Sequence, residues 1–181
     1  GAFMAVQYQV AFSSTIKGAG VVAGGPYYCA AGQIGFTGIC MGQVPFVLPN
    51  PELMVSAAKE YAALGKIDPL EHLKDDRIYV FSGTRDTVVY QQAVDATVSF
   101  FKQVGVDDRH LKYVNKVEAG HAFITPRFGN DCAANAAPYI SHCTVSGKGY
   151  DQAGEILRHI YGSLNAPATK PTGKILTFKQ R

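Results

Sequence analysis

The chain has 181 residues, of which 47% are hydrophobic and 17% are charged, and its formal net charge is +3. This length suits one domain with a substantial core, and the composition excludes intrinsic disorder, which requires low hydrophobicity and high net charge. The small, scattered excess of positive charge gives no electrostatic footprint for a nucleic-acid partner.

The first predicted elements are a helix at 2–13 and a buried strand at 16–23. Apolar residues recur at helical spacing in the first segment, and the second is a short apolar run that ends in Gly-Gly-Pro. Residues 18–51 carry no charge, but prolines and glutamines interrupt them. No window therefore resembles the roughly 20 consecutive apolar residues of a membrane span, and we expect none.

The later part of the chain alternates helices with short apolar strands. Asn50 suits a helix N-cap, and Gly65 and Gly162 suit helix ends. The predicted elements are a helix at 50–64, a strand at 77–82, a helix at 87–104, a strand at 111–117 and a helix at 150–161. The alternation predicts an α/β fold, with a parallel sheet covered by helices on both faces. Sites in such sheets form at the carboxyl ends of the strands.

A carboxylate and a histidine follow two consecutive predicted strands. Asp86 lies in GTRDTV after the strand at 77–82, and His121 lies in EAGHAF after the strand at 111–117. An imidazole that acts as a base needs a fixed carboxylate to orient it. Taken singly, Asp86 is equally interpreted as a helix N-cap and His121 as a loop histidine. Together, in the acid-then-histidine order of α/β hydrolases, they favour catalysis.

The nucleophile of such a site is expected before Asp86, in a G-x-S-x-G turn. The sequence contains no such motif. Gly1 stands directly before the first predicted helix, where the last glycine of the turn belongs. We therefore expect the serine two residues before Gly1, and we interpret the chain as the later part of a longer one.

The four cysteines form two groups with equal spacing. Cys29 and Cys40 are eleven positions apart, and so are Cys132 and Cys143. No C-x-x-C motif or zinc-finger histidine spacing accompanies them, so no structural zinc is expected. Their even number in weakly charged segments favours two local disulfides and an oxidising compartment. The alternative is four unpaired thiols in a cytosolic protein.

Several segments carry a resemblance to a known family. GAFMAVQYQVAFSSTIKGAGVVAGGPYYCA, FSGTRDTVV and VEAGHAFIT resemble the segment after the lipase box, the acid loop and the histidine loop of secreted poly(3-hydroxybutyrate) depolymerases. NDC, AAPYISHC, GEILRHIYG and GKILTFKQR are similar to later segments of the same family. The resemblance implies that residues 1–181 are a single, partial catalytic domain. They would form the C-terminal part of an α/β-hydrolase fold whose N-terminal strands and nucleophile turn lie upstream.

The resemblance also implies a function. The protein would be a secreted serine esterase that hydrolyses polyhydroxyalkanoate polyester or its oligomers, with Asp86 as the acid and His121 as the base. It would need no metal or organic cofactor. Its expected partners are a polyester or hydrophobic ester and the missing N-terminal portion of the same protein. The implied disulfides join Cys29 to Cys40 and Cys132 to Cys143.

Substrate contacts are predicted from aromatic residues near the strand ends. Tyr27 and Tyr28 follow the first strand, and Phe123 lies two residues after His121. They are candidates for an acyl pocket or polymer groove; the alternative is that the tyrosines pack beneath the cysteine loop. The uncharged stretch 30–51 is either a neutral face for polyester or a buried lid. Competing functions are an esterase of soluble feruloyl or acetylxylan esters and a non-catalytic, hydrolase-like binding piece.

Overall fold

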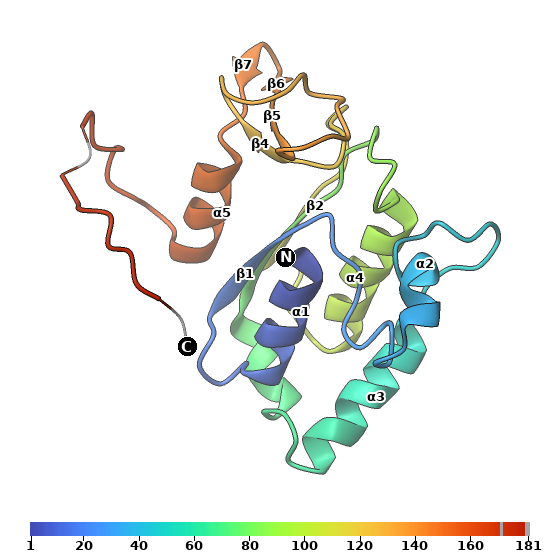
Figure 1. The fold of residues 1–181 in the computed structure, drawn as a ribbon. Coiled ribbons are helices and arrows are strands. Elements are labelled where there is room, and N and C mark those ends of the chain that lie inside the picture. The colour runs from blue at the N-terminus through green and yellow to red at the C-terminus, as the bar shows by residue number, and fades with distance from the viewer. Residues whose placement is uncertain (171, 180–181) are drawn as a thin grey trace.

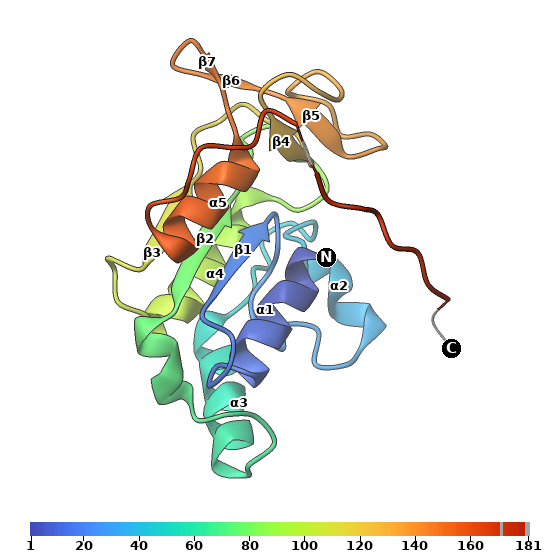
Figure 2. The ribbon, with the colours of Figure 1, turned by 90° about the vertical axis from the view of Figure 1, so that its left-hand side faces the viewer.

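The computed structural model describes residues 1–170 and 172–179 (Figure 1). These residues contain a parallel sheet of three strands in the order β1-β2-β3 (Figure 2). These strands are β1 (Gly18–Val22), β2 (Arg77–Phe81) and β3 (Leu111–Val114). The helices are α1 (Ala2–Ala11), α2 (Thr37–Cys40), α3 (Pro51–Ala63), α4 (Gln91–Gln103) and α5 (Gln152–Tyr161), with 3-10 helices at Ile34–Phe36 and Leu70–Asp75. Beyond the main sheet lie a parallel pair, β4 (Phe123–Thr125) with β5 (Ile140–His142), and an antiparallel pair, β6 (Thr144–Val145) with β7 (Lys148–Gly149).

Helices cover both faces of the main sheet, with α1 and α5 on opposite sides of β1 (Figure 2). One face buries Val21 and Val80 in a cluster shared with α1, α3 and α4. The other face buries Tyr79 in a second cluster beneath α5. A Cβ atom on Gly20 would lie 2.8 Å from a methyl carbon of Ile156, so glycine at this position lets α5 pack closely.

The predicted fold class is confirmed, as are several predicted helix ends. The side-chain oxygen of Asn50 accepts hydrogen bonds from the N–H groups of Glu52 and Leu53, at 3.0 and 3.3 Å, and so caps α3. Gly65 follows that helix with φ +66°, and Gly162 ends α5 with φ +78°. Both glycines have positive φ angles, which glycine adopts without the steric cost that other residues have.

Two predicted boundaries in the middle of the chain were wrong. The helix predicted at 87–104 begins only at Gln91, and Asp86 accepts the N–H groups of Val88 and Val89 within the non-helical segment before it. The strand predicted at 111–117 ends at Val114, the residue paired with the last residue of β2. Asp86 is therefore not the N-cap of this helix, a position that Tyr90 occupies.

The short helices and strands were not predicted from the sequence. The strands β4 to β7 have two or three residues each, and α2 has four, too few to establish a hydrophobic period. Gln180 and Arg181, at the end of the GKILTFKQR segment, lie outside the described residues. In the described part of the chain, every helix is too short or too polar to cross a bilayer.

Candidate active site

Asp86 and His121 lie on loops that follow neighbouring strands. The acid loop, residues 82–90, follows β2, and the histidine loop, residues 115–122, follows β3. Because β2 and β3 pair in parallel, both loops leave the same edge of the sheet. This is the edge at which the sequence predicted the site.

Backbone contacts join the two loops beyond the end of the sheet. The N–H of Thr84 donates to the carbonyl oxygen of Val117 at 2.8 Å. A Cβ atom on Gly83 would overlap the carbonyl group of Ala119, so the close approach of the loops requires glycine at this position. The relative position of the loops is thus set by main-chain contacts as well as by side chains.

The structure brings Asp86 and His121 into direct contact. Oδ2 of Asp86 lies 2.9 Å from Nδ1 of His121. Oδ1 of Asp86 accepts hydrogen bonds from the N–H groups of Val88 and Val89, both at 2.9 Å. The Asp86 side chain is completely buried. Donors on both oxygens therefore fix the plane of the carboxylate against the imidazole.

The imidazole is oriented with its second nitrogen available. In the neutral imidazole, the contact with the carboxylate assigns the proton to Nδ1 of His121 and leaves a lone pair on Nε2. Among the described residues, Nε2 has no hydrogen-bond partner, and 26% of the His121 side chain is exposed. A neutral imidazole held in this way by a buried carboxylate is suited to remove a proton from a hydroxyl group.

His121 lines a pocket of about 380 Å³. The pocket is lined by Gly1, Ala2, Ala5, Gly20, Val22, Ala23, His121, Ala122, Phe123 and Tyr139. Apart from the imidazole and the phenol, its side chains are apolar, so it suits an uncharged acyl group better than a charged one. Gly1 and the start of α1 form part of its wall.

Of the three aromatic residues predicted to contact substrate, the structure places one in the His121 pocket and two elsewhere. Phe123 is 37% exposed and lies in the pocket beside His121. Tyr27 is buried in the core with its ring stacked on Phe100, and this burial raises the pKa of its phenol above the ordinary value. Tyr28 packs edge-on against Tyr61, away from the His121 pocket. The structure therefore brings only Phe123 to the histidine.

Tyr139 is a pocket residue that the sequence did not single out. Its ring lies edge-on to the imidazole of His121, with 5.8 Å between the ring centroids. It reaches this position from the segment before β5, which no local pattern connects to the histidine loop. Tyr139 and Ala23, both in the pocket wall, have positive φ angles of 58° and 56°. Strained non-glycine backbone of this kind gathers at functional sites.

No serine of the described chain lies beside the imidazole. Ser13 and Ser82 are buried, and Ser56 donates to the carbonyl oxygen of Glu52 within α3. None of them lines the His121 pocket. In residues 1–170 and 172–179, no group of three or more His, Cys, Asp or Glu side chains is arranged to hold a metal ion.

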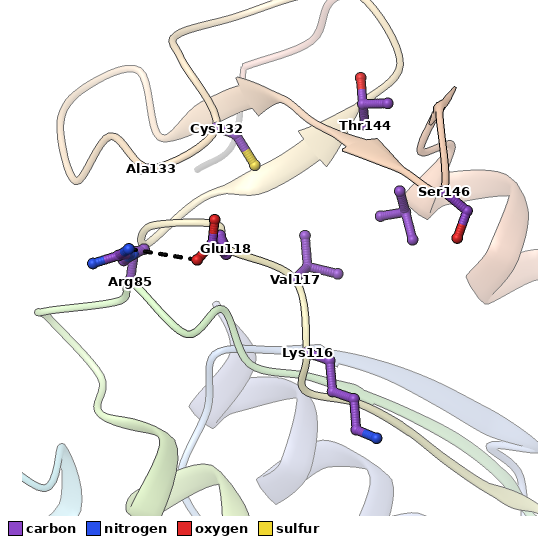
Figure 3. Close-up of a pocket in the computed structure, with 9 residues that line it drawn as sticks. Arg85, Lys116, Val117, Glu118, Cys132, Ala133, Thr144 and Ser146 are labelled. Carbon is purple, nitrogen blue, oxygen red and sulfur yellow. Dashed lines mark hydrogen bonds and ion pairs between the residues drawn. The ribbon is translucent and has the colours of Figure 1, made fainter.

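A larger pocket, of about 740 Å³, lies next to the acid loop (Figure 3), and neither Asp86 nor His121 lines it. Its lining residues are Arg85, Lys116, Val117, Glu118, Cys132, Ala133, Thr144, Val145 and Ser146. Arg85 and Glu118 form an ion pair at 3.4 Å, while the side chain of Lys116 extends away from them (Figure 3). Both partners are mostly exposed, so the pair contributes little to stability. This pocket contains no nucleophile paired with a base.

All four cysteines are paired, as the sequence favoured. Cys29 is bonded to Cys40, and Cys132 is bonded to Cys143. The second disulfide closes the segment that lies against the histidine loop, where the N–H of Gly120 donates to the carbonyl oxygen of Cys132 at 2.8 Å.

The sequence was compared with known proteins. No protein-family model matches the chain. Over 99% of its length, the chain is 45% identical to a poly(3-hydroxybutyrate) depolymerase of Delftia acidovorans. The chain is homologous to poly(3-hydroxybutyrate) depolymerases. It is also 33% identical, again over 99% of its length, to a polyhydroxybutyrate depolymerase of Talaromyces funiculosus. It spans 36% of the length of the first relative and 51% of the second.

Solved depolymerase structures have the same fold as this chain. A PHB depolymerase in complex with an R3HB trimer superimposes with a TM-score of 0.80 and is 32% identical. The crystal structure of PHB depolymerase from Penicillium funiculosum gives a TM-score of 0.79 at 31% identity. Each match covers 94% of this chain and 51% of the other. The fold is therefore of the α/β-hydrolase type.

Proposed function

We propose that this chain supplies the acid and the base of a serine esterase that hydrolyses poly(3-hydroxybutyrate) or its oligomers. The observation that carries the proposal is the contact between Asp86 and His121, at 2.9 Å, beside an apolar pocket. The homology to depolymerases, and the R3HB trimer bound to one related structure, support a polyester as the substrate.

The proposed chemistry is a two-step acyl transfer. Nε2 of His121 takes the proton of a serine hydroxyl while the serine oxygen attacks the ester carbonyl. The tetrahedral intermediate collapses, the ester C–O bond breaks, and His121 returns the proton to the leaving alcohol. Water then attacks the acyl-enzyme with His121 as base, which releases the acid and restores the serine. Asp86 orients His121 and stabilises the imidazolium that forms in each step.

The nucleophile is proposed to lie two residues before Gly1. Gly1 and Ala2 share a pocket wall with His121, so a residue directly before them is close to the imidazole. A serine at the turn into α1 would also match the G-x-S-x-G pattern with Gly1 as its last glycine. The first oxyanion donor would be the N–H of the residue between that serine and Gly1.

The substrate surface is proposed to include the uncharged segment that follows β1. In this segment Ile34 is 89% exposed and the Phe46 side chain is fully exposed, with φ +62°. Residues 18–51 carry no charge, so an uncharged polyester would approach this surface without desolvating an ion. Exposure of these side chains favours a substrate-facing surface over a buried lid.

The two disulfides support export to an oxidising compartment. An enzyme that degrades an insoluble polymer would act in such a compartment, outside the cell. We propose a secreted location on this ground. Reductant-free alkylation of the natural protein tests it, because paired cysteines leave no thiol to label. Labelling of four thiols would contradict it.

The substrate is tested by incubating the full natural protein with a poly(3-hydroxybutyrate) suspension, a feruloyl ester and acetylxylan. Loss of turbidity with release of hydroxybutyrate is the expected result. Hydrolysis of only the feruloyl or acetylxylan ester would overturn the polyester substrate and leave the esterase. No hydrolysis of any ester would overturn the enzymatic function and favour a binding role.

A further inference from the structure

One amide side chain contacts the backbone on both sides of the Asp86–His121 pair. Oδ1 of Asn135 accepts the N–H of Thr87 at 3.0 Å and the N–H of His121 at 2.8 Å. Its Nδ2 donates to the carbonyl oxygens of Arg85, at 2.9 Å, and Ala133, at 3.2 Å. Both lone-pair positions and both N–H groups of the amide are thus used.

Three of these four bonds involve the two functional loops. Arg85 and Thr87 flank Asp86, and the remaining N–H belongs to His121 itself. The amide group is planar and rigid, so it fixes the main chain of the carboxylate relative to the main chain of the imidazole. No other side chain of the described residues hydrogen-bonds the backbone of both loops at these positions.

We propose that Asn135 is a positioning residue that holds the Asp86–His121 pair in its productive geometry. The proposal rests on the proposed function, because it assigns Asn135 a task only if this pair performs the hydrolysis. Asn135 lines neither the His121 pocket nor the pocket beside the acid loop; it acts through the backbone of His121 and of the two residues that flank Asp86. A displacement of about 1 Å between catalytic groups lowers turnover by up to about 10²-fold.

The same loop contains a second asparagine that serves as a control. It distinguishes positioning of the Asp86–His121 pair from simple closure of the loop. Nδ2 of Asn130 donates to the carbonyl oxygens of Ala136 and Ala137, at 3.0 and 3.1 Å. Asn130 therefore holds the same segment by the same kind of bond, without contacting the acid or histidine loop. This makes it a matched control for Asn135.

The segment that carries Asn135 is itself fixed to the histidine loop. The disulfide from Cys132 to Cys143 closes it, and a Cβ atom on Gly120 would overlap the carbonyl groups of Ala133 and Ala134. The amide therefore sits on a rigid support rather than on a free loop, as positioning within about 0.5 Å requires.

The test compares Asn135→Ala with Asn130→Ala in the full natural protein, using a soluble short-chain ester. We expect Asn135→Ala to lower kcat by about 10²-fold with little change in KM, and Asn130→Ala to keep its kcat. The proton NMR signal of Nδ1–H in His121 should weaken or broaden only in Asn135→Ala. Melting temperatures of both variants give the loss of stability, so that kcat is compared at temperatures where both are folded.

Unchanged kcat in Asn135→Ala would overturn the proposal, as would an equal loss in Asn130→Ala. If Asn135→Ala does not fold, Asn135→Asp replaces it, since it keeps the accepting oxygen and loses both donated bonds; full kcat in that variant would also overturn the proposal. The variant His121→Ala distinguishes failure of the proposed function from failure of the proposed role of Asn135. Activity retained in His121→Ala defeats the proposed function, whereas an inactive His121→Ala with a fully active Asn135→Ala defeats only the role of Asn135.

Discussion

The two disulfide-closed loops have the same sequence separation, 11 residues, but very different surroundings. The loop from Cys29 to Cys40 exposes apolar side chains, Ile34 at 89% and Phe36 at 40%. The loop from Cys132 to Cys143 directs the amide of Asn135 into four hydrogen bonds beside the acid and histidine loops.

We infer from this difference that the two disulfides have different consequences for the proposed activity. Loop closure of this length contributes about 3 kcal/mol in the chain-entropy model, wherever the loop lies. If the first loop presents a surface to substrate, small displacements within it should matter little. If the second holds Asn135 in its hydrogen bonds, small displacements should disturb the Asp86–His121 pair. Removing either disulfide should therefore cost similar stability, but only the second should change turnover.

The largest expected effect comes from the pair that the second loop supports. His121→Ala and Asp86→Asn in the full natural protein should each lower kcat for a soluble ester by about 10⁴-fold, because the base or its orientation is lost. His142→Ala is the matched control, since His142 is exposed and its Nδ1 contacts only the carbonyl oxygen of Gly129, at 3.2 Å. Circular dichroism checks that each variant is folded. Near-normal kcat in His121→Ala would show that the base is another residue.

The second largest effect is expected from the removal of either disulfide. The double variants Cys132→Ala/Cys143→Ala and Cys29→Ala/Cys40→Ala should each lose about 3 kcal/mol of unfolding free energy, measured by urea denaturation. Only the first should also lower kcat, by about tenfold, because Asn135 then loses its support. Equal kcat in the two variants, both measured where they are folded, would remove the distinction between the loops.

A buried carboxylate at the opposite end of β2 provides a contrast in pH dependence. Asp76 is buried, where Gln9 donates to it at 2.6 Å, and burial raises its pKa to about 6. The unfolded carboxyl ionises near pH 4, so folding favours the protonated form. The contribution of Asp76 to stability should be fully present below pH 4 and be lost, by about 3 kcal/mol, as the pH rises through 6.

Asp76→Asn should abolish that decline, as measured by melting temperature between pH 4 and 8. It should leave kcat unchanged, since Asp76 lies at the start of β2 rather than beside the site. A decline of the same size in Asp76→Asn would assign the pH dependence to another group.

The smallest effect is expected at the apolar surface. Phe46→Ser should weaken adsorption to a poly(3-hydroxybutyrate) film by about fivefold, which is about 1 kcal/mol and roughly half the value of burying a whole Phe side chain. Hydrolysis of a soluble ester should not change. Phe178→Ser, in the exposed C-terminal segment, is the control. Equal adsorption of Phe46→Ser and the unmodified protein would exclude this surface from polymer binding.

The sequence predicted those parts of the site that local pattern determines. Asp86 and His121 follow apolar runs of strand type, so the parallel sheet alone places them at one edge. The even number of cysteines in weakly charged segments favoured disulfides, and the family resemblance implied the pairing that the structure has. The layered fold followed from the alternation of helix and strand periods.

The remaining parts depend on contacts between distant segments. Asn135 and Tyr139 reach the histidine loop through a segment without regular periodicity, and no local rule distinguishes Asn135 from Asn130. The start of α4 was misplaced because residues 87–90 are not helical, although their sequence continues the helical spacing of α4. Tyr27 lies in the loop after β1 but its side chain is buried in the core, where its ring stacks on Phe100 of α4.

The proposed mechanism requires His121 to activate a serine close to Gly1. Treating the full natural protein with a serine-directed fluorophosphonate and mapping the adduct by peptide mass spectrometry tests this. We expect one adduct, on a serine two residues before Gly1, formed much more slowly in His121→Ala. An adduct on another residue, or equal labelling of His121→Ala, would contradict it.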